Sequence, residues 1–194
     1  MSAELAELRL PTGWQWRRLG DQDAPALQQF FDANPEYFLR VGDEGPTADE
    51  AVQELASLPP PELRYREHWS LGFEQQGRMQ ALAVLDAGLQ HDEVWHIGLF
   101  IVATSLHGQG VAAQLYQSLE DWAAAEGARW MRLGVVAGYE QAERFWRGRG
   151  FVEVRQRHAI TMGKRLNSVR VMIKPLGEQG IEQYLSLVPR DRPE

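Results

Sequence analysis

The sequence contains no cysteine, which removes several chemistries at once. Disulfide bridges, thiolate metal sites and cysteine nucleophiles are all excluded. The chain also lacks any apolar run near the ~18 residues of a membrane-spanning helix. Its first stretch, MSAELAELRLPTG, carries acids early and has no apolar centre, unlike a signal peptide. We therefore expect a cytoplasmic protein that neither spans nor binds a membrane.

The net charge of −7 disfavours general affinity for nucleic acid, but the charge is unevenly distributed. Residues 144–174 hold nine Lys or Arg and a single acid, Glu153, so the rest of the chain is strongly acidic. A basic part that meets an anionic cofactor and an acidic part that meets an amine would fit this asymmetry. Ordinary solvated faces would give the same pattern, and the charge alone does not separate the two explanations.

The 194 residues are long enough for one well-buried core, and they alternate between strand-like and helix-like patterns. Short links between three successive strand-like runs predict an antiparallel meander. We expect one α/β domain over 1–194, with a core at about 12–177 and a C-terminal extension at 178–194. Its sheet should be mixed, mostly antiparallel and of about seven strands, with helices on both faces. The expected strands are 14–19, 68–75, 78–88, 93–103, 130–136, 151–160 and 168–176; the expected helices follow Asp23 and Thr47 and cover about 109–126, 139–147 and 180–188.

A glycine turn stands between an apolar strand and a helix, an arrangement in which backbone N–H groups can hold a phosphate. A P-loop is excluded, because Gly110 is followed by Val111 instead of lysine. The spacing Gly108-x-Gly110-x-x-Ala113 fits a dinucleotide fingerprint, but that fingerprint belongs in the first turn of a parallel sheet. Glycines that only tighten a turn are a further alternative.

The same turn resembles the acetyl-CoA signature of the GNAT N-acetyltransferase superfamily. The run from Ala142 to Phe151, AERFWRGRGF, is similar to a second motif of that family, and Val102 matches the valine that ends its fourth strand. The order of elements from Trp14 to Leu176 also fits. Two motifs in the right order are far more specific than the glycines alone.

The resemblance implies acetyl-CoA as acyl donor and no metal. Backbone N–H groups at a helix N-terminus would hold the pyrophosphate, and these belong to His107, Gly108, Gln109, Gly110, Val111 and Ala112. The pantetheine arm would lie along the fourth strand at Phe100, Ile101 and Val102 and pack against Trp146. Gly98 is unusual in an apolar strand. It would mark the bulge that the family has in this strand, or a place where a ligand or another backbone segment comes close to the strand.

Two catalytic positions follow less directly. The family's usual tyrosine acid is replaced by Trp146, whose indole cannot act as an acid, so Tyr139 is the nearby substitute. The family's base position falls on His96, where a histidine with a pKa near ~6.5 could take a proton from the amine. Instead of acting in catalysis, Tyr139 could form part of the wall of the site, and His96 could have a purely structural role in its strand. Weaker candidates for the base are Glu36, Asp86 and Glu93.

Nearby histidines and acids do not make a convincing metal site, since strand alternation places Glu93 opposite His96 and the pattern HExxH is absent. The acceptor amine should enter near Glu36, Tyr37 and Phe38, although ordinary helix packing would also explain these residues. We expect an N-acetyltransferase for the primary amine of a small molecule or peptide. A GNAT-fold module that binds acyl-CoA without turnover and a nicotinamide-dependent oxidoreductase are the alternatives. The sequence fixes neither the acceptor nor the oligomeric state, for which a homodimer stays open.

Overall fold

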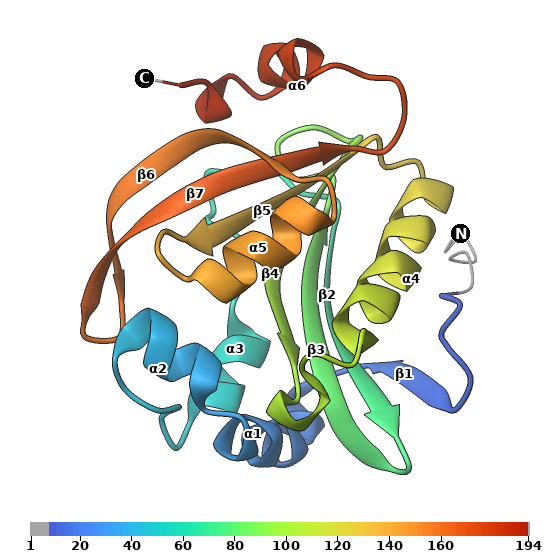
Figure 1. The fold of residues 1–194 in the computed structure, drawn as a ribbon, viewed down its shortest axis with the longest axis vertical. Helices are drawn as coiled ribbons and strands as arrows, with labels where there is room; N and C mark the ends of the chain where they lie inside the picture. The colour runs from blue at the N-terminus through green and yellow to red at the C-terminus, as the bar shows by residue number, and fades with distance from the viewer. Residues whose placement is uncertain (1–7, 194) are drawn as a thin grey trace.

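The computed structural model describes residues 8–193 and contains one seven-stranded sheet in the order β1-β2-β3-β4-β5-β7-β6 (Figure 1). Neighbouring strands are antiparallel except for β4 and β5, which are parallel. This confirms the predicted mixed sheet. The strands are β1 Trp14–Arg18, β2 Glu67–Gln75, β3 Arg78–Ala87, β4 Val94–Val102, β5 Trp130–Val136, β6 Val152–Met162 and β7 Arg165–Pro175.

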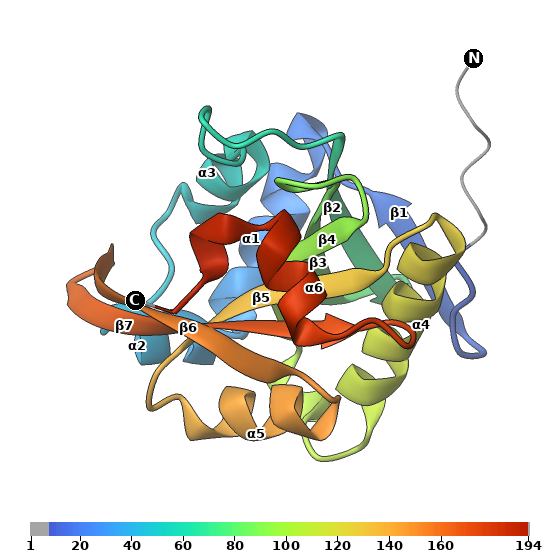
Figure 2. The same ribbon diagram turned by 90° about the horizontal axis from the view of Figure 1, so that it is seen from above.

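Helices cover both faces of the sheet, as the view from above shows (Figure 2). One face carries the N-terminal helices, and the other carries α4 and α5. The helices are α1 Ala24–Ala33, α2 Glu36–Gly42, α3 Glu50–Ala56, α4 Val111–Ala125, α5 Glu140–Gly148 and α6 Ile181–Leu187. Helix α2 is absent from the predicted helices, and its residues Phe38 and Val41 give it a buried face.

Each face of the sheet has its own apolar core. On the α4 side, Trp69, Trp95 and Trp122 meet with ring centroids 5.0–5.1 Å apart. On the other side, Leu27 and Phe31 of α1 are fully buried against β3 and β4. A fully buried side chain of this size contributes roughly 1.5–3 kcal/mol. The two cores fix the sheet rigidly, and the site described below is built where the sheet opens.

The tip of the β6–β7 hairpin is fastened to the end of α2. The Lys164 N–H donates to the Gly42 carbonyl at 2.8 Å, and the Asn167 side chain donates to the Val41 carbonyl at 2.8 Å. Gly163 has a φ of +54°, and a Cβ there would lie 2.7 Å from the Gly42 oxygen. No side chain fits at this crossing, so the hairpin and α2 form one continuous wall.

The C-terminal segment folds back over the start of β4 and over β5 and β7. Tyr184 and Val188 are buried there, followed by a short 3-10 turn, η3, at Pro189–Asp191. Asp191 is fully buried and accepts two bonds from Arg132, at 2.6 and 2.9 Å, and one from the Tyr184 hydroxyl at 2.6 Å. The segment is thus pinned by a buried charge pair at its end. The residues 1–7, which begin the stretch compared with a signal peptide, lie outside the described residues, and no described helix has the length and apolarity to span a bilayer.

Candidate active site

The sheet opens between its two parallel strands. β4 and β5 pair only from Val94 with Trp130 to Ile97 with Leu133, and beyond this point β5 continues with β7 alone. Opposite β3, the register of β4 shifts at Gly98, which is the extra residue of a bulge. The bulge expected at Gly98 is therefore confirmed. After Gly98, strand pairing with β5 no longer engages the backbone groups of β4.

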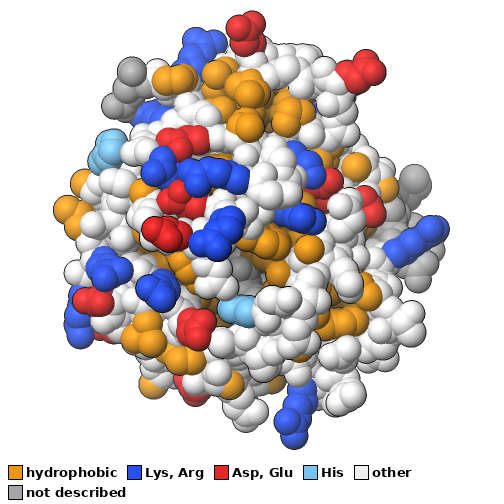
Figure 3. Space-filling view, viewed as in Figure 1, with side chains coloured by type: hydrophobic (Ala, Val, Ile, Leu, Met, Phe, Trp, Pro, Cys, Tyr) orange, Lys and Arg blue, Asp and Glu red, His pale blue; other side chains and the backbone are white. Residues whose placement is uncertain are grey.

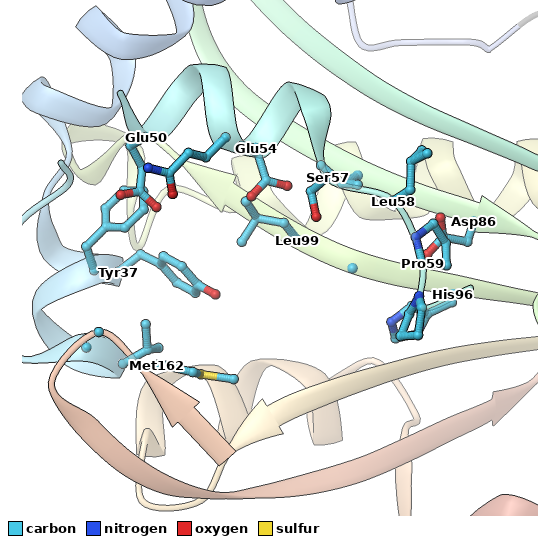
Figure 4. A pocket seen from close by; sticks show the side chains of 18 of the residues that line it. Tyr37, Glu50, Glu54, Ser57, Leu58, Pro59, Asp86, His96, Leu99 and Met162 are labelled. Atoms are coloured by element: carbon cyan, nitrogen blue, oxygen red, sulfur yellow. The ribbon is translucent and has the colours of Figure 1, made fainter. Parts of the chain in front are cut away.

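Two cavities meet at this opening. The first, the strand-gap cavity, has a volume of about 430 Å³ and runs between the diverging strands to the glycine turn and α5. The second, the α3 cavity, has about 600 Å³ and lies between α3 and the β6–β7 hairpin (Figure 4). Both are lined by Tyr37, Val41, His96, Gly98, Leu99, Arg132, Arg157 and Met162. Two molecules that enter from opposite sides would meet at these residues.

The glycine turn lies at the outer end of the strand-gap cavity. Gly108 and Gly110 have φ values of +75° and +80°, and a Cβ at either position would meet nothing within 4 Å. Only the backbone conformation demands glycine here, and the space above the turn is open. The first N–H groups of α4, from Val111 on, have no acceptor within the helix and point toward this space. The turn is suited to hold an anion.

The expected set of donors needs one correction. The His107 N–H donates to the Thr104 carbonyl at 3.1 Å, and the Gln109 N–H lies 3.4 Å from the Leu106 carbonyl. Both are engaged within the turn itself, so the donors left for a phosphate are those of Gly108, Gly110 and the start of α4. The His107 ring instead bonds the Val102 carbonyl at 2.9 Å and ties the turn to the end of β4.

The basic region expected at 144–174 corresponds to α5, β6 and β7, and Lys and Arg side chains gather over these elements on one face (Figure 3). Part of its charge is neutralised locally. Glu143 bonds Arg147 at 2.8 Å and Arg170 at 3.2 Å, and Arg170 also bonds Glu153 at 2.6 Å. The excess of positive charge near the turn is therefore smaller than the sequence count suggests.

The strand-gap cavity has an aromatic wall. Phe100, Phe145 and Trp146 all line it, with the Phe100 and Trp146 rings 5.8 Å apart. Trp146 also packs against Tyr116 of α4 at 5.3 Å and is only 7 % exposed. It is as much a core residue as a cavity wall. The side chains of Ile101 and Val102 are buried too, so these two residues present mainly backbone to the gap.

Two tyrosines and an acid converge on the strand-gap cavity. Tyr139 directly precedes α5, and Glu36 opens α2; both line this cavity together with Tyr37. Burial and the negative charge of Glu36 raise the pKa of Tyr139 above its usual value, and burial does the same for Tyr37. Figure 4 shows the Tyr37 ring directed into the α3 cavity. Phe38 differs, since it packs in the core beside Phe31 at 5.0 Å and reaches only the edge of the α3 cavity.

His96 belongs to a polar row that crosses the sheet. Strand register places His68 of β2 beside Asp86 of β3, Asp86 beside His96, and His96 beside Arg132 of β5. The His68 ring bonds Asp86 at 2.7 Å, and the Arg132 guanidinium lies 3.2 Å from His96 Nδ1. Burial and the Arg132 charge lower the pKa of His96 to about 3. The ordinary pKa expected from the sequence is therefore wrong, because the sequence hides this neighbour.

A carboxylate that the sequence analysis missed faces the same space. Glu54 of α3 lines the α3 cavity, and its carboxylate is turned toward Leu99 (Figure 4). Within residues 8–193 no hydrogen bond or ion pair to this carboxylate is found. Burial and the charge of Glu50 raise the pKa of Glu54. By contrast, Glu93 lies beside Arg129 at 3.5 Å and lines neither cavity.

The described part of the chain contains no group of three or more His, Asp or Glu side chains placed to hold a metal ion. The turn also lacks the context of a dinucleotide fingerprint, since it follows a strand of an antiparallel meander.

Comparisons with known proteins agree with this geometry. The model of the acetyltransferase (GNAT) family matches residues 27–151. No curated protein matches the chain in sequence. Among solved structures, RimL, a ribosomal-protein alpha-N-acetyltransferase in complex with coenzyme A, has a TM-score of 0.69 at 16% identity over 87% of this chain and 97% of its own. An acetyltransferase from Thermus thermophilus has a TM-score of 0.67 at 21% identity, and the match covers 87% of this chain and 100% of that protein's chain. A ribosomal-protein-S18-alanine N-acetyltransferase from Escherichia coli has a TM-score of 0.61 at 18% identity, and the match covers 87% of this chain and 97% of that protein's chain.

Proposed function

Because the chain belongs to the GNAT acetyltransferase family, we propose that it transfers an acetyl group from acetyl-CoA to the primary amine of a small molecule or peptide. The observation that carries the proposal is the meeting of the two cavities at the split between β4 and β5. One cavity ends at a turn suited to hold an anion, and the other is lined by the acids Glu50 and Glu54. This is the geometry of a two-substrate transfer site.

The strand-gap cavity fits acetyl-CoA on three counts. The open turn at Gly108 and Gly110 suits the pyrophosphate, the unpaired edge of β4 suits the amides of the pantetheine arm, and the aromatic wall suits its aliphatic part. The thioester supplies an activated acetyl group without any metal. Residues of the chain then have two tasks, which are to align the amine and to manage two protons.

The acceptor amine is protonated at neutral pH and must lose a proton before its nitrogen can attack. His96 is a weak base here, since burial and the positive charge beside it keep its pKa at about 3. Glu54 is better suited, because burial raises the pKa of its carboxyl and brings it closer to neutrality. We assign Glu54 as the group that attracts the ammonium and receives its proton, directly or through water.

The second proton goes to the leaving sulfur. Trp146 cannot supply it, because an indole N–H is not an acid. Tyr139 lines the strand-gap cavity, and its raised pKa keeps it protonated at neutral pH. It can therefore hydrogen-bond the departing sulfur, and water can complete the transfer.

Release of free coenzyme A tests the proposal directly. The protein has no cysteine, so a thiol-reactive dye reports coenzyme A without a protein background. Turnover of acetyl-CoA that depends on an added amine supports the transferase, after subtraction of the rate with acetyl-CoA alone. For Glu54→Gln we expect a fall of about 10²–10⁴ in kcat at pH 7, which becomes smaller at high pH where free amine is abundant.

A second function, acyl-CoA binding without turnover, is favoured by the presence of Trp146 where the family has its tyrosine acid. Calorimetry separates the two. Tight binding of acetyl-CoA, with no coenzyme A released across amines of every class, would identify a binding module.

A further inference from the structure

The α3 cavity carries opposite charges on its two sides. Figure 4 shows α3, with Glu50 and Glu54, on one side of the cavity and the β6–β7 hairpin with Met162 on the other. The lining residues Arg132, Arg157 and Arg190 come from β5, β6 and the η3 turn. A ligand of this cavity that has one positive and one negative end would find a partner for each.

The arginine side holds more positive charge than its own acid neutralises. Arg132 binds Asp191 through two nitrogens, at 2.6 and 2.9 Å, which already compensates that buried carboxylate. Arg157 donates to the same Asp191 at 3.2 Å, so two guanidinium groups share one acid. Burial and the nearby charges of Arg132 and Arg190 lower the pKa of Arg157. A lowered arginine pKa means that the charged form is disfavoured, and an added anion would relieve this.

Arg157 is placed where an acceptor would need it. Its side chain is 26% exposed and lines both cavities, so it stands at their junction instead of in the depth of the protein. The phosphates of a cofactor would lie at the far end of the strand-gap cavity, at Gly108 and Gly110. An anion at Arg157 would therefore belong to the acceptor and would lie close to its reacting amine.

We propose that the acceptor is a free amino acid, held between the Arg157 guanidinium, which binds its carboxylate, and the Glu54 carboxylate, which faces its ammonium group. Glu54 and Arg157 both line the α3 cavity, and an amino acid offers one charge to each of them. A guanidinium is the side chain best matched to a carboxylate, because its fork can donate two parallel hydrogen bonds.

This inference rests on the proposed function and makes its chemistry specific. The ammonium loses one proton toward Glu54, and its nitrogen forms a bond to the acetyl carbon. The carbon–sulfur bond breaks, the nitrogen gives up its second proton, and water held by Tyr139 passes this proton to the sulfur. The products are an N-acetylamino acid and coenzyme A. The carboxylate takes no part in bond making and serves only to orient the amine.

A panel of matched acceptors tests the substrate class. Each of the twenty amino acids is compared with its carboxamide, its decarboxylated amine and a dipeptide that begins with it, and coenzyme A release is measured. A charge-assisted hydrogen bond to the carboxylate corresponds to about 10- to 100-fold in kcat/KM. We expect the preferred amino acid to exceed its carboxamide, amine and dipeptide by that factor.

Variants connect this preference to Arg157. Arg157→Gln can still donate to Asp191, so it should fold, and melting curves check this. It should lower kcat/KM for the amino acid about 10- to 100-fold and leave the decarboxylated amine nearly unchanged, so that the selectivity is lost. Arg157→Lys keeps the positive charge but loses the two parallel donors of the guanidinium, so it should retain part of the selectivity for the amino acid. Arg165→Gln, on the same hairpin but outside both cavities, is the matched control.

The outcomes separate this inference from the proposed function. Equal rates for amino acids and their carboxamides, or a better rate for dipeptides, would overturn the amino-acid class while the transferase stands. Selectivity that survives in Arg157→Gln would overturn the role of this residue. A panel with no reactive amino acid would overturn the inference, and if acetyl-CoA also fails to bind in calorimetry, the proposed function is wrong as well.

Discussion

Replacing Gly110 by aspartate separates the anion site from the fold. The φ of +80° at this position penalises any residue with a Cβ, by about 1–2 kcal/mol, but no protein atom lies within 4 Å of the added Cβ. The apo protein should therefore keep its structure and lose roughly 2–8 °C in Tm. The new carboxylate would stand at the mouth of the turn, where the pyrophosphate is expected.

The effect on binding is larger than the effect on folding. Repulsion between the carboxylate and a phosphate a few ångströms away is worth about 3 kcal/mol near a protein surface, or roughly a 100-fold rise in Kd. Acetyl-CoA at about 100 times the wild-type Kd stabilises the wild type by ~2.7 kcal/mol, a shift of roughly 5–11 °C. At the same concentration the variant should gain only about 1 °C. Thermal melts with and without acetyl-CoA measure both numbers.

Gly110→Asn is the matched control, because it adds a side chain of the same size and the same backbone strain without the charge. It should lose the same apo stability as Gly110→Asp and keep most of the shift caused by acetyl-CoA. Equal shifts in the two variants would show that no phosphate approaches the turn. The pyrophosphate assignment would then be wrong, whatever the activity.

Four further changes test other parts of the site. Gly98→Val should fold normally, since a Cβ there meets only Val84 at 3.6 Å, but its side chain would fill the junction and reduce kcat/KM at least ~10-fold in the coenzyme A assay. Trp146→Ala should lower stability by about 3–5 kcal/mol in denaturant melts, because the indole is buried in the core as well as in the cavity wall. His96 has a pKa of about 3 in the folded protein, whereas in the unfolded chain it protonates near pH 6.5, so the stability that it contributes is complete above pH 6.5 and is lost on acidification. Between pH 6.5 and 4.5 the free energy of unfolding of the wild type should therefore fall by about 2 kcal/mol more than that of His96→Gln. The pH–rate profiles of the two proteins should stay parallel. Asp191→Ala leaves Arg132 buried without its partner and should cost about 3–5 kcal/mol, with parallel melts of Arg190→Gln as the control.

Most of the fold could be predicted from the sequence, because its signals are local. The strands β3, β4 and β5 are short apolar runs bounded by turn residues, and α4 carries its periodic apolar face between two glycines. The exception was α2, whose seven residues show too few turns for a clear period. Its burial comes from partners far along the chain, such as the β6–β7 hairpin, and no local pattern reports such contacts.

The candidate active site likewise has features that could be predicted from the sequence and features that could not. The turn at Gly108 and Gly110 was predictable because the backbone conformation itself demands glycine at these two positions. The chemistry of His96 was not, because its pKa depends on its burial and on Arg132, which lies 36 residues further along the chain and meets His96 through strand pairing. Glu54 was overlooked for a related reason: on its own helix it resembles any solvated acid, and only the cavity beneath α3 distinguishes it.

The two halves of the site also differ in their relation to the family. The family match ends at residue 151, so it contains the glycine turn and α5 but neither β6 nor the C-terminal segment. On the arginine side of the α3 cavity, Arg132 lies within the match, whereas Arg157, Arg190 and the Asp191 that holds Arg132 and Arg157 lie beyond it. The turn and α5, which we propose hold the acyl donor, thus lie in the matched part of the chain, and Arg157, which we propose binds the acceptor, lies in the part that follows. Because Asp191 is fully buried and holds both Arg132 and Arg157, the end of the chain sets the position of the guanidinium at the junction. We therefore expect substitutions in β6 and after β7 to change the preference among acceptors in the coenzyme A assay and to leave the binding of acetyl-CoA in calorimetry unchanged.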